Sequence, residues 1–328
     1  MRAAVLTAAG VMTVVDDREE PVAGIGEVIV EVDTVGLCGT DLGYWTGARS
    51  LWADAIVLGH EAVGRIVAIG PGVDPARIGA VVAVEPNYPC GRCAACLRAH
   101  PALCTDRRSP VIREDGFLAE RVAVPDAFAW TVPVGVAAPD AAAIEPLAVV
   151  LAALRRAGEI DPAQSVLVVG AGSIGRIAVD VLVRRGLRPA VVDRLPDRVA
   201  RAVALGARTD DAGERVDLVI ETTGSGAAAT AAVDRLAPAG RMVVVGLGAE
   251  PLALDTRVLV RRGLTIIGSM TYDHPVDFAA AVAAVAEGRA RPGAVLGDEY
   301  PLDRAADAFT AAATAADKVV IRCSPSTT

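Results

Sequence analysis

The segment Ser165–Arg194, with the sequence SVLVVGAGSIGRIAVDVLVRRGLRPAVVDR, decides the fold of the second half of the chain. An apolar run at Val166–Val169 comes first, and three glycines with G-x-G-x-x-G spacing follow it. These glycines are Gly170, Gly172 and Gly175. Apolar residues then recur at helical spacing, and a second apolar run ends at Asp193. Strand, glycines, helix and a second strand ending in an acidic residue have the order of a dinucleotide-binding βαβ unit.

The glycine turn has the features of a phosphate cradle. Gly170 makes the tight turn after the strand, and Gly172 lets a pyrophosphate approach the backbone at the N-terminus of the helix. Gly175 lets the helix pack closely on the strand. We place Ser173 and Ile174, in the same turn, among the cofactor-binding residues. The turn thus predicts a bound nicotinamide dinucleotide, with a flavin or an empty Rossmann domain as the alternative.

The residue at the end of the second strand bears on the choice of cofactor. We expect the Asp193 carboxylate to accept hydrogen bonds from the adenosine ribose hydroxyls. Its negative charge would repel a 2′-phosphate, which favours NAD over NADP. Arg194 and Arg198 follow closely, and a guanidinium there can receive such a phosphate, so NADP stays open as an alternative.

Three more apolar runs extend the same sheet. They are Asp217–Gly224, Gly240–Gly248 and Leu264–Met270. Alanine-rich helical stretches separate them, as in a parallel sheet that helices cover on both faces. Because ligands bind at the carboxyl ends of such strands, we expect the loops there to border the nicotinamide. The residues concerned are Gly246, Leu247, Ser269 and Met270.

Length and composition indicate a folded protein of two domains. A chain of 328 residues exceeds what one hydrophobic core usually serves, and 53% of the residues are hydrophobic. The net charge is −8 and the basic residues are scattered, which argues against a nucleic-acid partner. Polar residues interrupt the apolar run after Arg2, so we expect a first strand and hairpin rather than a signal peptide. No run approaches the roughly 20 apolar residues of a membrane span, so we expect a cytoplasmic protein without a membrane partner.

Four cysteines lie close together in the segment PCGRCAACLRAHPALC. They are Cys90, Cys93, Cys96 and Cys104. Thiolates two residues apart on a tight loop can converge on one ion, and four sulfurs complete the tetrahedral shell of a structural zinc. Disulfides are less fitting because they suit small secreted domains. An iron–sulfur cluster is less fitting because seven residues, rather than three, separate the last two cysteines. We therefore expect a zinc-holding lobe at about residues 86–106.

A second metal site is indicated by an isolated cysteine and an isolated histidine. Cys38 stands in VGLCGTDLGYW, more than 50 residues before the next cysteine. His60 stands in LGHEAVGR, beside Glu61. A catalytic zinc takes three protein ligands of these types and leaves one position open. Each residue alone would more simply be a core or surface side chain, so the expectation rests on their combination.

Taken together, the motifs resemble the zinc-containing medium-chain dehydrogenase/reductase family. The matching segments are CGTD at 38–41, GHE at 59–61, the four-cysteine lobe, EPLAV at 145–149 and GAGSIG at 170–175. Their order and spacing match over essentially the whole chain. The segment Glu145-Pro146-Leu147 is similar to the sorbitol, or polyol, dehydrogenase branch, where alcohol dehydrogenases proper carry a cysteine.

The resemblance implies a fold of class α/β and its domain limits. A GroES-like, β-rich catalytic domain spans residues 1–145, and a Rossmann domain with a doubly wound parallel sheet spans residues 146–289. Residues 290–328, where the alternation of strands and helices ends, return to the catalytic domain. The resemblance also implies two zinc ions per chain, one catalytic and one structural, and a homodimer or homotetramer.

For the catalytic zinc, the resemblance implies Cys38 and His60 as ligands, with Glu61, Glu145 or both completing the site. Successive side chains of an extended segment point to opposite faces, so His60 and Glu61 can share one ion only where the backbone is distorted. Pro146 suits the first turn of a helix, so Glu145 can also serve simply as a carboxylate at a helix N-terminus.

The implied reaction is the reversible oxidation of a secondary alcohol to a ketone, with hydride transfer to the nicotinamide. Thr40 matches the position that passes the alcohol proton outward, and Tyr44 matches a position that contacts polyol. We also expect Trp45 at the substrate, with core packing as the alternative, and we expect Asp41 to hold its loop through backbone hydrogen bonds. Gly43 departs from the family pattern, because a relay histidine often stands there.

Several small-molecule alcohol or ketone substrates are compatible with these motifs. A polyol, cyclitol or sugar-like alcohol is the first expectation. An NADP-preferring glucose or aldose dehydrogenase and a 2,3-butanediol-type dehydrogenase are alternatives within the enzyme class. A noncatalytic zinc- and dinucleotide-binding protein is the alternative outside it.

Overall fold

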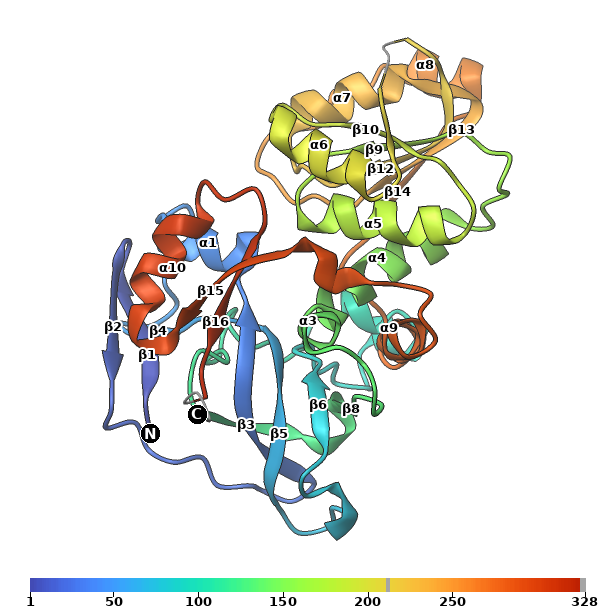
Figure 1. Cartoon of the computed structure of the whole chain (residues 1–328). Coiled ribbons are helices and arrows are strands. Elements are labelled where there is room, and N and C mark those ends of the chain that lie inside the picture. The colour runs from blue at the N-terminus through green and yellow to red at the C-terminus, as the bar shows by residue number, and fades with distance from the viewer. Residues whose placement is uncertain (211–212, 325–328) are drawn as a thin grey trace. The chain divides into compact units, whose positions relative to one another are not determined.

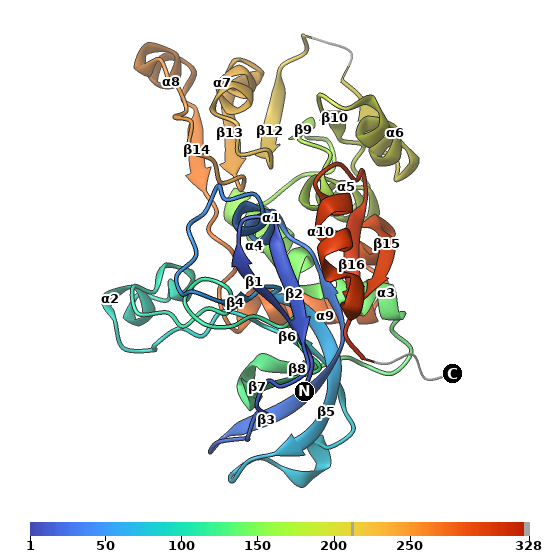
Figure 2. The same cartoon turned by 90° about the vertical axis from the view of Figure 1, so that its left-hand side faces the viewer.

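The computed structural model describes residues 1–210 and 213–324, and its elements are labelled in Figures 1 and 2. It divides into two compact units. We call the first the β unit (Met1–Glu145 with Gly293–Thr328) and the second the α/β unit (Pro146–Pro292). The limits expected from the sequence lie after residues 145 and 289. In the described ranges, no helix has both the length and the apolar character that a membrane span requires.

The β unit is built on a sheet with strand order β15-β16-β3-β5-β6-β8, in which β7 pairs with the first half of β3. These strands are β3 (Glu27–Gly36), β5 (Glu61–Ile69), β6 (Val81–Val84), β7 (Arg121–Pro125), β8 (Ala129–Thr131), β15 (Leu296–Pro301) and β16 (Lys318–Arg322). A second sheet has the order β2-β1-β4. It consists of β1 (Ala3–Ala8), β2 (Val11–Val15) and β4 (Ile56–Val57), and β1–β2 is the antiparallel hairpin expected near the N-terminus. The α-helices of this unit include α1 (Gly39–Trp45), α2 (Ala94–Leu97), α3 (Ala138–Ala142) and α10 (Ala305–Ala312).

Strand β3 lies inside this sheet, and its side chains are buried on both faces. Val28, Ile29 and Val30 are all buried, and β-branched residues suit such a strand. The apolar core around them includes Phe309 of α10 and Ile321 of β16. Segments on either side of the α/β unit in the sequence therefore share one core, and Figure 1 shows β15 and β16, in red, beside the blue β3.

The α/β unit holds a sheet with strand order β11-β10-β9-β12-β13-β14, and all its neighbouring strands are parallel. The strands are β9 (Val166–Val169), β10 (Ala190–Val192), β11 (Arg208–Thr209), β12 (Val216–Glu221), β13 (Leu236–Val244) and β14 (Thr265–Gly268). The helices include α5 (Ser173–Arg184), α6 (Pro196–Ala204), α7 (Gly226–Asp234), α8 (Thr256–Arg262) and α9 (Val276–Ala286). Helix α4 (Ile144–Ala157) begins in the β unit and ends in this one.

The strand order reverses between β9 and β12. The chain runs from β9 outward to β11 on one side and then returns to β12, β13 and β14 on the other. Right-handed crossovers then place α5 and α6 on one face and α7 and α8 on the opposite face; Figure 1 shows α7 and α8 above the sheet and α5 below it. The predicted doubly wound sheet is confirmed, and its switch point lies at the carboxyl ends of β9 and β12, where such sheets bind ligands.

Three strands of this sheet end earlier than the apolar runs predicted. β12 ends three residues before Gly224 (224 − 221), β13 four before Gly248 (248 − 244) and β14 two before Met270 (270 − 268). The residues released in this way form the loops at the carboxyl edge of the sheet. Glycines weaken a strand, and they follow β12 at Gly224 and β13 at Gly246 and Gly248. The apolar pattern alone did not take their effect into account.

Two glycines of the turn after β9 have different surroundings. A Cβ atom on Gly175 would lie 1.8 Å from the carbonyl oxygen of Gly170. A Cβ atom on Gly172 would meet nothing within 4 Å. Gly175 therefore permits α5 to pack on the end of β9, whereas Gly172 leaves open space at the start of that helix.

We expect Gly175→Ala to destabilise the protein, because a backbone oxygen cannot move aside as a flexible side chain can. The free energy of unfolding should fall by about 1–3 kcal/mol or more. Gly172→Ala is the matched control and should change stability by less than about 0.5 kcal/mol. Urea unfolding followed by circular dichroism measures both variants, and equal losses would contradict this account of the turn.

Candidate active site and metal centres

Three strand ends meet in the β unit, and the sheet topology fixes which residues lie there. β3 ends at Gly36, which lies opposite Glu61, the first residue of β5. β16 runs antiparallel along the other side of β3, with Val320 opposite Gly36. Cys38, two residues beyond β3, therefore comes close to the start of β5 and to Lys318 at the start of β16.

Cys38, His60 and Glu61 form a group of potential metal ligands. One donor atom of each lies within 4.8 Å of the others. His60 precedes β5, so strand alternation does not force its side chain away from that of Glu61. Sulfur, nitrogen and carboxylate oxygen together fit a zinc ion. Among the described residues, the group that meets this distance does not include Glu145.

Asp41 ties together the two loops that carry Cys38 and His60. Its Oδ2 accepts a hydrogen bond from the Cys38 N–H at 3.0 Å, and its Oδ1 accepts one from the Gly59 N–H at 2.9 Å. Oδ2 also lies 3.4 Å from His60 Nδ1. Burial alone would raise the pKa of Asp41, but His60 and the two N–H groups outweigh it and lower that pKa. A charged carboxylate at Nδ1 orients the imidazole and leaves Nε2 for a metal.

Glu61 also has a buried partner, the ammonium of Lys318. The Lys318 Nζ lies 2.6 Å from Glu61 Oε2 and donates to Oε1 at 2.8 Å. It donates as well to the carbonyl oxygen of Leu37 at 3.0 Å. The lysine and glutamate side chains are only 3% and 2% exposed. A Cβ atom on Gly36 would lie 2.5 Å from Glu61 Oε2, so glycine leaves the room that this ion pair needs.

Neighbouring negative groups keep Lys318 protonated. Burial alone would lower the pKa of Lys318, but Glu61, Cys38 and Glu145 outweigh it and raise that pKa. Glu145, which is buried in the first turn of α4, thus also contributes to the raised pKa of Lys318. Because a carboxylate has two oxygens, Glu61 can face a metal ion and Lys318 at once.

Sequence reasoning assigned no role to Lys318. The available signal was its setting, since it is the one lysine among 32 basic residues and directly precedes the apolar run Val319–Ile321. A charged side chain at the end of a buried strand needs a partner. Nothing in the local sequence indicates that this partner is Glu61.

The four-cysteine lobe has the dimensions of a zinc–thiolate site. Cys93 Sγ lies 3.6 Å from Cys96 Sγ and 3.8 Å from Cys104 Sγ, too far apart for disulfides. Zinc–sulfur bonds of about 2.3 Å at tetrahedral angles separate the sulfurs by about 3.8 Å. Donor atoms of all four cysteines lie within 4.8 Å of one another. The lobe therefore fits one zinc ion.

Backbone N–H groups around the lobe stabilise thiolates. Cys90 N–H donates to Cys104 Sγ at 3.3 Å, and Cys93 N–H donates to Cys90 Sγ at 3.4 Å. The N–H groups of Cys96 and Thr105 lower the pKa of Cys93 to about 5. Cys93 is thus a thiolate at neutral pH, the form that binds metal.

In the α/β unit, the glycine turn leads into α5. Gly172 is the N-cap of this helix, and Ser173 and Ile174 form its first turn. The free N–H groups of a helix N-terminus attract phosphate, and the open space at Gly172 lets a phosphate approach them. The turn therefore has the shape and the donors that a pyrophosphate requires.

Asp193 follows β10 and is fixed by the backbone. Its Oδ2 accepts from the Ala171 N–H at 2.7 Å, and its Oδ1 accepts from the Leu195 N–H at 2.9 Å. The carboxylate is thereby held beside the glycine turn. Arg198 lies in α6, the helix that follows.

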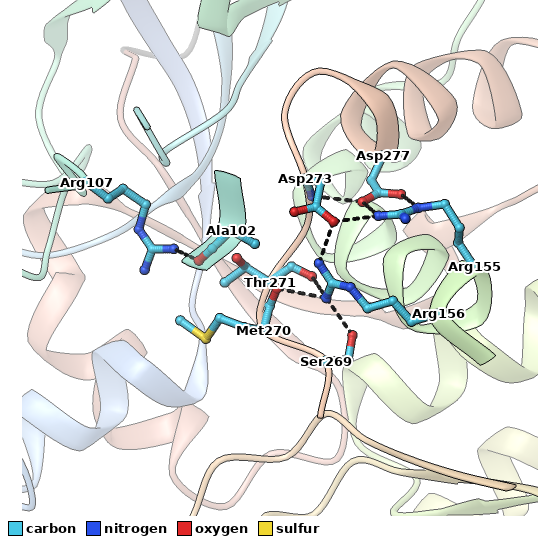
Figure 3. Close-up of polar contacts among 9 residues, drawn as sticks. All are labelled: Ala102, Arg107, Arg155, Arg156, Ser269, Met270, Thr271, Asp273 and Asp277. Carbon is cyan, nitrogen blue, oxygen red and sulfur yellow. Dashed lines mark hydrogen bonds and ion pairs between the residues drawn. The ribbon is translucent and has the colours of Figure 1, made fainter. Parts of the chain in front are cut away.

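The remaining residues expected at the cofactor lie in the loops after β13 and β14. Gly246 packs against the loop after β12, because a Cβ atom on it would lie 2.1 Å from the nitrogen of Gly224. Leu247 is 73% exposed. Ser269 Oγ and the Met270 carbonyl each accept a hydrogen bond of 2.8 Å from Arg156, a residue that the sequence did not single out (Figure 3).

One face of α1 carries Thr40, Gly43 and Tyr44, since residues three and four apart are neighbours on a helix. Arg49 covers part of this face. A Cβ atom on Gly43 would lie 3.1 Å from Arg49 Cδ, and the guanidinium carbon lies 6.0 Å from the centre of the Tyr44 ring. The Arg49 side chain thus occupies the space that a histidine at position 43 would need.

Trp45 packs in the β unit, which is the alternative that the sequence left open besides the substrate pocket. Its ring lies 5.4 Å, centre to centre, from the ring of Phe309 in α10. It packs, partly buried, against the core of the β unit. This contact fixes α1 against α10, and the role of Trp45 at the substrate stays a prediction.

Two family models match the two units of the chain. One, described as "Alcohol dehydrogenase GroES-like domain", matches residues 24–134, and one described as "Zinc-binding dehydrogenase" matches residues 173–287. The L-galactonate-5-dehydrogenase of Escherichia coli (strain K12) is 33% identical over 308 residues, which cover 89% of each chain. The chain belongs to the zinc-containing medium-chain dehydrogenase/reductase family.

Other members of this dehydrogenase family agree with the assignment. The sorbitol dehydrogenase of Bacillus subtilis (strain 168) is 30% identical over 310 residues, 86% of this chain and 85% of that one. A solved short chain alcohol dehydrogenase from E. coli CFT073, in complex with NADH, has a TM-score of 0.91 and 27% identity and covers 98% of this chain and 99% of its own. The predicted family, its polyol-like relatives and its dependence on zinc and a nicotinamide cofactor are confirmed, and a noncatalytic role finds no support among these relatives.

We expect about two zinc ions per chain, one at Cys38 and one in the four-cysteine lobe. Cys38→Ala should remove one ion with little change in melting temperature. Cys93→Ala should remove the other ion and lower the melting temperature, because a structural zinc contributes to folding. Cys323→Ala, a buried cysteine outside both groups, is the control and should keep both ions. Elemental analysis measures the stoichiometry, and one ion per wild-type chain would refute the two-site assignment.

We expect Lys318→Met to lower the free energy of unfolding by about 3–5 kcal/mol, because it leaves the Glu61 carboxylate buried without its cation. Lys318→Arg should lower the free energy of unfolding much less. The double variant Lys318→Met with Glu61→Leu should regain most of the loss, since no charge is then left buried. Urea unfolding in a Cys38→Ala background, where the zinc that Glu61 would face is absent, measures all three. Equal losses in the single and double variants would show that the ion pair is not the cause.

Proposed function

We propose that this dehydrogenase reversibly oxidises a secondary alcohol of a polyol, cyclitol or sugar-like substrate to a ketone, with NAD as the hydride acceptor. The observation that carries the proposal is the convergence of Cys38, His60 and Glu61, whose donor atoms lie within 4.8 Å of one another. Three protein donors leave the fourth position of a tetrahedral zinc to the substrate oxygen. The names of two relatives, L-galactonate-5-dehydrogenase and sorbitol dehydrogenase, support a polyhydroxylated substrate.

The residues of the site have separate tasks in this reaction. Cys38, His60 and Glu61 would hold the zinc ion, which when bound supplies a Lewis acid that lowers the pKa of the alcohol hydroxyl. Asp41 keeps the His60 ring oriented through Nδ1. Thr40 Oγ1 would accept the alcohol proton and pass it to water, because Gly43 has no side chain to continue a relay. A bound nicotinamide would supply the hydride acceptor, so that the alcohol would lose one hydride from carbon and one proton from oxygen in becoming the ketone.

The preference for NAD rests on the position of Asp193. Two backbone N–H groups hold its carboxylate beside the glycine turn. There it can accept hydrogen bonds from ribose hydroxyls and would repel a 2′-phosphate. Arg198 supplies a positive charge from the next helix, so NADP belongs in every assay as the competing cofactor.

A sugar acid or polyol phosphate is a second candidate substrate class, and Arg49 favours it. The Arg49 guanidinium lies over Tyr44, on the face of α1 that also carries Thr40. It pairs with no carboxylate in the described part of the chain. A free guanidinium suits the carboxylate or phosphate end of a substrate. L-galactonate, named in one relative, carries such a carboxylate.

A substrate panel with both cofactors tests the proposed function. It should contain neutral polyols, inositols, aldoses, aldonates, polyol phosphates and 2,3-butanediol, with the absorbance of reduced nicotinamide as the readout. We expect one polyhydroxylated class to exceed butanediol in kcat/KM by at least about tenfold, and NAD to exceed NADP. If the protein binds NADH and turns over none of these compounds, the proposal fails.

Arg49→Gln separates the two candidate classes within the same panel. It should raise KM for anionic substrates by about tenfold or more and leave neutral ones nearly unchanged. Arg304→Gln is the matched control, because Arg304 lies over another tyrosine of the β unit, Tyr300, at 5.5 Å. An equal effect of Arg49→Gln on neutral and anionic substrates would exclude the anionic class.

A further inference from the structure

Two consecutive arginines near the end of α4 anchor the segment that follows β14 (Figure 3). Arg155 donates to both carboxylate oxygens of Asp277, at 2.7 and 2.8 Å, and to Asp273 Oδ2 at 2.7 Å. Arg156 donates to the same oxygen of Asp273 at 2.9 Å. The two arginines therefore share an acidic partner, and both stabilise the approach to α9.

Of these two arginines, Arg156 alone also contacts the three residues directly after β14, which we call the β14 turn (Ser269–Thr271). Its Nη1 donates to Ser269 Oγ and to the Met270 carbonyl at 2.8 Å each, and to the Thr271 carbonyl at 3.3 Å. Figure 3 shows these acceptors directed at the guanidinium, while the Met270 side chain points away from it. This one terminal nitrogen thus donates to an acceptor in each residue of the turn.

The backbone of the β14 turn is strained at Thr271. Its φ is +36°, in a region that side chains branched at Cβ rarely adopt. Such conformations persist where the surroundings impose them, and they gather at functional sites. Here Arg156 holds the carbonyl groups on both sides of the strained residue's Cα, those of Met270 and Thr271.

The β14 turn keeps hydrogen-bonding groups that the protein itself does not use. The Thr271 hydroxyl is buried and has no partner within residues 1–210 and 213–324. The N–H groups of Met270 and Thr271 likewise donate to no acceptor in those ranges. The two carbonyls already accept from Arg156. Two N–H donors beside a hydroxyl match a primary carboxamide, whose oxygen accepts and whose nitrogen donates.

The position of the turn agrees with such a ligand. It lies at the carboxyl end of β14, on the sheet edge to which the glycine turn after β9 also belongs. This is the edge at which open parallel sheets bind their ligands. We propose that Arg156 is a positioning residue for the cofactor: it holds the β14 turn in the conformation that receives the nicotinamide carboxamide. The inference rests on the proposed use of NAD, and Arg156 itself does not touch the cofactor.

Two ligands separate this role from general support of the fold. NADH carries the nicotinamide carboxamide, whereas ADP-ribose has the same adenosine and pyrophosphate without it. Arg156→Gln should weaken NADH binding by about tenfold, as expected for a misplaced hydrogen-bonding partner, and leave ADP-ribose binding unchanged. Calorimetry with ADP-ribose and the fluorescence of bound NADH measure the two affinities.

Arg155→Gln is the matched control. It removes bonds to the same acidic residues from the neighbouring position but touches no residue of the β14 turn. It should lower stability without changing the ratio of the two affinities. The same shift of that ratio in Arg155→Gln and Arg156→Gln would overturn the proposal, as would an equal loss of NADH and ADP-ribose binding in Arg156→Gln.

A second variant tests the turn while leaving Arg156 intact. Thr271→Val keeps the branched shape and removes the unpartnered hydroxyl. It should weaken the binding of NADH and leave the binding of ADP-ribose unchanged. Unchanged NADH binding would overturn the assigned carboxamide contact. If the wild-type protein binds neither ligand, the proposed NAD function fails as well, whereas wild-type binding with unaltered variants refutes only the role of Arg156.

Discussion

The ammonium of Lys318 and the carboxylate of Glu61 face each other, almost out of reach of water, where β3 ends and β5 and β16 begin. Removing two such charges from water costs several kcal/mol for each ion, and only close pairing with further hydrogen bonds compensates it. The Leu37 carbonyl supplies one of those bonds. The three strand ends must therefore keep their register, and that register is also what brings Cys38 and His60 together. The same ion pair thus contributes to closing the sheet and to placing Glu61 in the ligand group.

The α/β unit positions its ligand-facing atoms through contacts of another kind, between side chains and backbone groups. Asp193 is held by two N–H groups, and the β14 turn is held by the guanidinium of Arg156. In each case the anchoring bonds are made within the protein and leave other polar groups available to the cofactor that we propose. A site prepared in this way needs little rearrangement when the ligand arrives.

Features that depend on residues close together in the chain could be predicted from the sequence. The glycine turn and the four-cysteine lobe are of this kind, because each uses residue types with few alternative roles at that spacing. Cys38 and His60 were predicted as ligands only through their combination and the family resemblance. The partners of Glu61 and Ser269 were missed, since Lys318 is 257 positions from Glu61 and Arg156 is 113 from Ser269. No local periodicity reports such pairs. Strand ends were placed too late because the predicted runs included the glycine-containing loops after β12 and β13 and the first two residues after β14.

The interruption of the β unit by the α/β unit has a consequence for synthesis on the ribosome. β3, β5 and the four-cysteine lobe emerge first, and the whole of Pro146–Pro292 follows before β16 appears. Domains tend to fold as units while the chain is still growing. The α/β unit can therefore be complete while the end of β3 is still an open strand edge and Glu61 still lacks its cation. Such an unpaired edge in a half-made sheet can pair with another chain until β16 arrives and closes it.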